Sequence, residues 1–107
     1  MENASQEYIA ATIMHELIHA YMGAYMGIVR NNDTQHPLMV GTYAVQHMAG
    51  SLESLFPGLS HEHAMAMAWQ GLDTTPTWIL SMSMGEKFVI QNINDQYKNH
   101  ALGTPCP

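Results

Sequence analysis

Apolar residues recur at intervals of three and four along the first quarter of the chain, the spacing of one face of an amphipathic helix. This spacing predicts a helix from Ala4 to about Met26, with Asn3 as its N-cap, and an apolar stripe made of Ile9, Ile13, Leu17, Ala20 and Ala24. Gly27 and the polar run over residues 30–35 then end the pattern.

A second helix is predicted where the apolar spacing resumes. Pro37 suits the first position of a helix, and His36 would stand before it as the N-cap. The helix should continue to Leu55, because Pro57 and Gly58 stop the pattern soon afterwards.

The remaining helices are indicated by hydroxyl side chains that can cap a first turn. We expect helices over residues 61–70, 76–80 and from 84 onward, capped by Ser60, by Thr75 before Pro76, and by a capping box of Ser83 with Glu86. Beyond the last helix the chain should fray. The best strand candidate, residues 27–29, is very short, so we predict an all-α fold: a small helical bundle in a single domain over residues 1–107.

Composition and charge narrow the possible partners. Three Lys and Arg residues stand against nine Asp and Glu, and the resulting net charge of -6 argues against nucleic acid as a partner. No apolar run approaches the roughly 18 residues that a membrane span requires.

The single cysteine, Cys106, cannot form an internal disulfide. The first helix starts almost at residue 1, so we expect a C-terminal piece of a longer protein, with its upstream domains as partners.

The chemistry is concentrated in the sequence His15-Glu16-Leu17-Ile18-His19. On a helix, the two imidazoles lie one turn apart on one face, where they can share a tetrahedral zinc ion. Glu16 lies on the flank of that face and can act as general base toward a zinc-activated water. The face of His15 and His19 is otherwise largely apolar, since it also carries Tyr8, Ala11, Met22 and Met26.

A catalytic zinc requires a third protein ligand and an open position. We predict His36 for this role, because it follows a short loop that can return the chain to the first helix. His47 lies eleven residues later, about 16 Å further along a helix, so it cannot join His36 at one ion. His63 is the alternative third ligand, and His47 is more simply a core or surface histidine.

Other candidate groups have simpler explanations. His63 and Met67 share a helical face and could form a copper site, but methionines at helical spacing usually fill a core. Tyr21, Tyr25 and Tyr43 could stabilise a tetrahedral intermediate, yet tyrosines on amphipathic helices are usually packing residues, and we select none of them.

These motifs together resemble a known family. Residues 11–21 are similar to the active-site helix of zincin metallopeptidases, particularly the SprT-like group. More specifically, the chain resembles the C-terminal metallopeptidase-like domains of Bacteroidetes secreted proteins and lipoproteins. The resemblance is carried by the spacing of His36, Met39 and Tyr43, by residues 66–72, by Thr75 and Trp78, and by the Gly-x-Pro-Cys end.

The resemblance implies zinc on His15, His19 and His36, with Glu16 as the base. It also implies a secreted or cell-envelope location and attachment to a longer protein. The chain departs from zincins in one respect, because they usually hold substrate against the edge of a sheet before the active-site helix, and no such sheet is predicted here. Gln70 also stands where the family pattern has the first glycine of a pair.

Two functions remain open at this point. In the first, the domain hydrolyses a peptide or protein substrate with a zinc-activated water. In the second, the same ligands fasten helices together in a zinc-stabilised binding or structural module without turnover. Glu16 favours the enzyme, because a purely structural site has no need for a carboxylate at that position.

Overall fold

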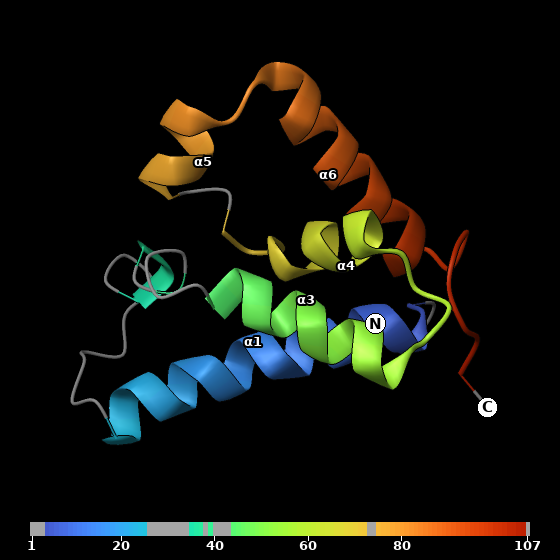
Figure 1. Cartoon of the computed structure of the whole chain (residues 1–107), viewed down its shortest axis with the longest axis horizontal. Coiled ribbons are helices and arrows are strands. Elements are labelled where there is room, and N and C mark those ends of the chain that lie inside the picture. The colour runs from blue at the N-terminus through green and yellow to red at the C-terminus, as the bar shows by residue number, and fades with distance from the viewer. Residues whose placement is uncertain (1–3, 26–34, 38, 40–43, 73–74, 107) are drawn as a thin grey trace.

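The fold is all-α. The computed structural model describes residues 4–25, 35–37, 39, 44–72 and 75–106, and no strand occurs among them. Its helices are α1 (Gln6–Tyr25), α3 (Ala44–Leu55), α4 (His61–Ala68), α5 (Pro76–Ser81) and α6 (Met84–Lys98) (Figure 1). Among the described residues, no helix is both long and apolar enough to cross a membrane.

The helices are arranged so that α4 lies at the centre of the packing. Helix α3 lies alongside α1, α4 packs against α3 and α6, and α1 also contacts α4 and α6 (Figure 1). The core between them contains many alanine, methionine and leucine side chains, of which Ala11, Met39, Leu52, Met67 and Leu72 are fully buried, together with buried aromatic residues such as Trp78. The small alanine side chains of α4 allow α3 and α6 to approach it closely, and methionines fill the irregular spaces between the helices.

The predicted N-caps of α4, α5 and α6 are confirmed. The side chain of Ser60 accepts a hydrogen bond from the backbone of His63, and that of Thr75 accepts one from Trp78. Ser83 and Glu86 form the predicted reciprocal capping box at the start of α6. These boundaries are set by local hydrogen bonds, which the sequence displays directly.

The apolar stripe that predicted α1 is not the face that the helix buries. Ile13 and Leu17 of the predicted stripe are 53% and 62% exposed, whereas His15, His19 and Met22 are buried. The helix turns its histidine face inward, so the groups that it buries are the imidazoles of His15 and His19 together with Ala11 and Met22. The Ser5 side chain accepts a hydrogen bond from the Tyr8 N–H at the start of α1, and the predicted cap, Asn3, lies outside the described residues.

The predicted start of the second helix is also corrected. Gln35 and His36 are already helical, so His36 lies inside a helical turn and is not an N-cap. The predicted end at Leu55 is confirmed by α3. The strand candidate at residues 27–29 and the side chain of Tyr43 lie outside the described residues.

The C-terminal segment is fixed to the start of α1, contrary to the predicted fraying. The backbone N–H of Gln6 donates to the Thr104 carbonyl at 2.9 Å, and the Thr104 N–H donates to the buried carboxylate of Glu7. The Thr104 hydroxyl donates to the same carboxylate at 3.2 Å. The first of these bonds gives a partner to a backbone N–H in the otherwise unpaired first turn of α1, and the others hold the tail to a side chain of the same turn.

Candidate metal centre

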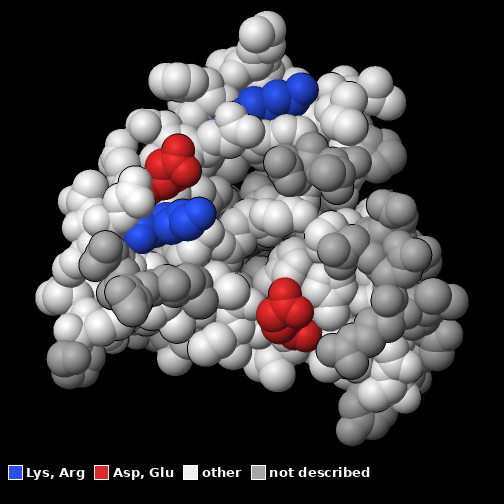
Figure 2. Space-filling view, turned by 180° about the vertical axis from the view of Figure 1, so that it is seen from behind, with Lys and Arg blue, Asp and Glu red and all other residues white. Residues whose placement is uncertain are grey.

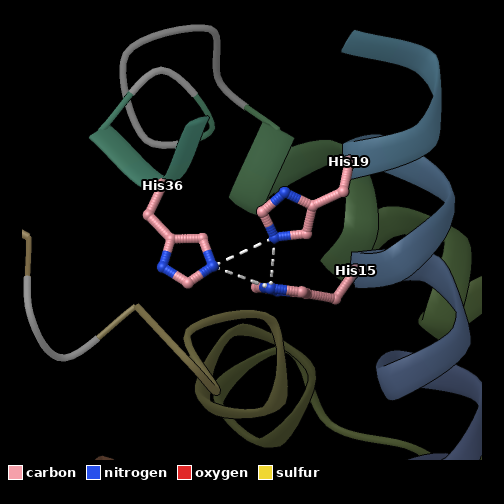
Figure 3. A group of neighbouring side chains, drawn as sticks. All are labelled: His15, His19 and His36. Atoms are coloured by element: carbon pink, nitrogen blue, oxygen red, sulfur yellow. Dashed lines mark hydrogen bonds between the residues drawn. The ribbon is translucent and has the colours of Figure 1, made fainter. Parts of the chain in front are cut away.

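Three buried histidines converge at the middle of α1. His15 and His19 project from successive turns of this helix, and His36 reaches them from the helical residues 35–37 (Figure 3). Their side chains are only 5–7% exposed. The three Nε2 atoms are mutually 3.0 to 3.1 Å apart, and the cluster can hold a metal ion.

This convergence favours a cation at its centre. An imidazole nitrogen that carries a proton has no lone pair with which to accept, so three mutually contacting nitrogens cannot all be hydrogen-bonded to one another. With a cation, each nitrogen instead directs its lone pair at the ion. Tetrahedral zinc with Zn–N distances of 2.0–2.1 Å requires nitrogen separations of about 3.3–3.4 Å. The observed separations are within a few tenths of an ångström of that requirement, so the residues fit the ion.

Gln35 orients one of the three rings. Its fully buried side-chain oxygen lies 2.6 Å from Nδ1 of His19. An amide oxygen only accepts, so Nδ1 carries the proton and Nε2 presents its lone pair to the cluster. An acceptor behind a ligand imidazole is the usual means by which proteins fix the tautomer of a metal-binding histidine.

His15 is held in its neutral form by its surroundings. Burial, followed by the neighbouring His19 and His36, lowers the pKa of His15 to about 4, while Glu16 acts in the opposite direction. The ring also lies against Gly71, where an added Cβ would come within 3.3 Å of its Cε1 atom. Gly71 has φ of +77°, so glycine satisfies both the backbone conformation and the close approach.

Glu16 lies on a cavity that reaches His15. This cavity, of about 330 Å³, is lined by His15 and Glu16 together with Tyr8, Thr12, Gln70, Gly71 and Lys98. Glu16 itself is exposed. Figure 2 shows the face opposite to that of Figure 1, which carries few charged side chains and is hollowed near its middle. A carboxylate beside a buried ligand and open to solvent can exchange a proton with a water in the cavity.

The other histidines take no part in the cluster. Nδ1 of His63, the alternative third ligand, lies 2.7 Å from the Tyr97 hydroxyl. His61 pairs with Glu53, and His47 is exposed on α3. Met67 lies in the hydrophobic core, as the simpler explanation of the methionines predicted.

Sequence reasoning missed three residues of the site: Gln35, Gly71 and Lys98. Gln35 precedes His36 directly, and the only available signal was that adjacency. Gly71 lies within the stretch 66–72 that carries the family resemblance, but nothing in the sequence places it against the ring of His15. Lys98 lies 83 residues after His15, so only the tertiary structure shows that both line one cavity.

Comparisons with protein-family models, with curated proteins and with solved structures give no match for this chain. The candidate metal centre is therefore supported by its own geometry. The three imidazoles converge, an acceptor lies behind His19, and Glu16 lines the adjoining cavity.

Proposed function

We propose that this domain hydrolyses peptide bonds with a zinc ion held by His15, His19 and His36 and with Glu16 as general base. One observation carries the proposal: a buried three-histidine cluster adjoins a cavity that also contains the carboxylate of Glu16. Three neutral imidazoles suit zinc, and three protein ligands leave a fourth position for water or substrate.

The protein groups divide the work between binding and proton transfer. A zinc ion would polarise the peptide carbonyl and acidify water. Glu16 accepts the proton of the attacking water and returns it to the leaving amine, so one carboxylate serves both steps. Gln35 keeps Nε2 of His19 free of a proton. Burial keeps His15 neutral by lowering its pKa.

The test compares the zinc-loaded wild-type chain with Glu16→Gln on a mixed pool of peptides. The substitution preserves the size of the side chain but removes its ability to take a proton. Zinc affinity should therefore survive, while hydrolysis falls by at least about a hundredfold. Glu62→Gln is the control, because Glu62 is an exposed helix-start glutamate outside the cavity. Equal hydrolysis by Glu16→Gln and wild type would refute the proposal.

A second function is a zinc-stabilised binding module without turnover. Two observations favour it: all three histidines are buried, and the described residues include no strand edge on which a peptide could be added. A wild-type protein that binds zinc tightly, gains stability from it and cleaves nothing in the pool would establish this function in place of the first.

A further inference from the structure

The geometry points to a carboxylate-binding position at Lys98, which would anchor a short peptide in the cavity beside Glu16. This inference rests on the proposed function and adds the substrate class: a peptide with a carboxylate a few residues from the bond to be cut. The carboxylate is either the free C-terminus of the peptide or an acidic side chain.

The cavity has one acidic and one basic side chain in its lining, Glu16 and Lys98. Glu16 and Lys98 are its charged lining residues besides the metal-binding His15, and the rest of the lining is neutral. Lys98 makes no ion pair with any residue that the structure describes. The other described lysine, Lys87, instead donates to the Ile79 carbonyl at 3.2 Å. An unpaired ammonium group on a cavity wall is free to bind an anion.

The backbone of Lys98 lies beside the start of α1, which is the end of the cavity's α1 wall away from Glu16. It is the last residue of α6, and the carbonyl of its neighbour Tyr97 accepts a hydrogen bond from the Ser5 N–H just before α1. Tyr8 and Glu16 are eight residues apart on α1, which corresponds to about 12 Å along the helix. Three to four residues of extended peptide, at roughly 3.3 Å each, cover that length.

Electrostatics then sets the direction of binding. A substrate carboxylate is repelled by Glu16 and attracted by Lys98, so the two charges favour one placement in which the carboxylate is held away from the metal. A carboxylate bound at the three histidines would instead occupy the position that water or the peptide carbonyl needs. Lys98 therefore also reduces unproductive binding of the same group at the metal.

A neighbouring cavity offers room for an apolar side chain of the same peptide. It measures about 170 Å³ and shares Tyr8, Gln70 and Gly71 with the first cavity. Trp69, Trp78 and Ile90 contribute its apolar surface, and Asp95 is its acidic residue. Asp95 disfavours a carboxylate there, which leaves Lys98 as the position for that group.

Equilibrium binding tests the inference without turnover. The zinc-loaded Glu16→Gln chain is titrated with three N-acetylated tetrapeptides of alanine and phenylalanine: one with a free C-terminal carboxylate, one amidated, and one amidated but with an aspartate. We expect the carboxylate-bearing peptide to bind about three- to fivefold more tightly than the neutral amide. Lys98→Met should abolish this preference and Lys98→Arg should retain it.

The controls separate this inference from the proposed function. Lys87→Met removes the same charge from the same helix but outside the cavity, so the preference should remain.

Preference for the free acid alone identifies the C-terminus as the anchored group, and preference for the aspartate peptide identifies a side chain. Equal binding of all three peptides, no binding of any of them, or an unchanged preference in Lys98→Met would overturn the inference. Hydrolysis by wild type with no carboxylate preference would refute Lys98 alone. Carboxylate preference without hydrolysis would refute only the peptidase.

Discussion

At the residue scale, the arrangement of the three histidines depends on neighbouring residues outside the cluster. The amide oxygen of Gln35 fixes the tautomer of His19, and Gly71 leaves the space that the His15 ring occupies. Substitution of either neighbour would leave all three histidines in the sequence and still disturb their geometry. We therefore expect metal affinity to respond to residues that no ligand motif contains.

Gln35→Leu tests this dependence. Leucine fills a similar volume but leaves the Nδ1–H of His19 without its acceptor, so zinc affinity should fall about 10- to 100-fold. Gln35→Glu retains an acceptor and should bind zinc about as tightly as wild type. Competition with a chromophoric chelator measures the affinities. Gln46→Leu, on the exposed face of α3, is the matched control, and a loss of affinity as large in this control would contradict the role of Gln35.

At the element scale, helix ends were predictable and helix faces were not. The caps at Ser60, Thr75 and Ser83 are local hydrogen bonds, so neighbouring residues in the sequence determine them. The buried face of α1 is determined instead by what α3 and α4 present to it. The chain buries His15 and His19 there and leaves Ile13 and Leu17 exposed. Both faces of this helix carry apolar residues at helical spacing, so the apolar periodicity alone does not decide which face is buried.

The same scale explains why the C-terminal segment is ordered. It adds hydrogen bonds to the first turn of α1, and the buried carboxylate of Glu7 accepts two of them from Thr104. From the sequence, this segment is only a tail that contains Gly and Pro. Its partner carboxylate lies 97 residues earlier, so no local pattern links the two.

Glu7→Gln tests that attachment. The amide of glutamine has one neutral acceptor oxygen in place of two charged ones, so the hydrogen bonds from the Thr104 N–H and hydroxyl become fewer or weaker. The free energy of unfolding at pH 7 should therefore fall by about 1–2 kcal/mol. Glu62→Gln is the matched control, since Glu62 also occupies the first turn of a helix but is exposed. Its effect should stay within about 0.5 kcal/mol. Urea denaturation followed by circular dichroism measures both, and equal losses would show that the tail contributes nothing beyond a helix-start charge.

At the scale of the whole molecule, the centre joins parts of the chain that local signals cannot relate. The pair His15 and His19 was predictable from one helical turn, and His36 was selected from loop length alone. The structure brings His36 to this pair across 17 and 21 residues and adds a cavity wall from α6. Gln70, Gly71 and Lys98 were not predictable as cavity partners of Glu16, because they reach it only through the packing of α4 and α6 against α1.

The zinc X-ray absorption spectrum of the chain, loaded with one equivalent of zinc, tests directly whether His15, His19 and His36 form an open metal site. We expect three imidazole nitrogens at about 2.0–2.1 Å and one oxygen ligand from water, which is the coordination of an open, catalytic site. A sphere of four imidazoles would indicate a closed structural site. A sphere with fewer than three imidazoles, or a chain that retains no zinc, would contradict the assignment of His15, His19 and His36 as its ligands.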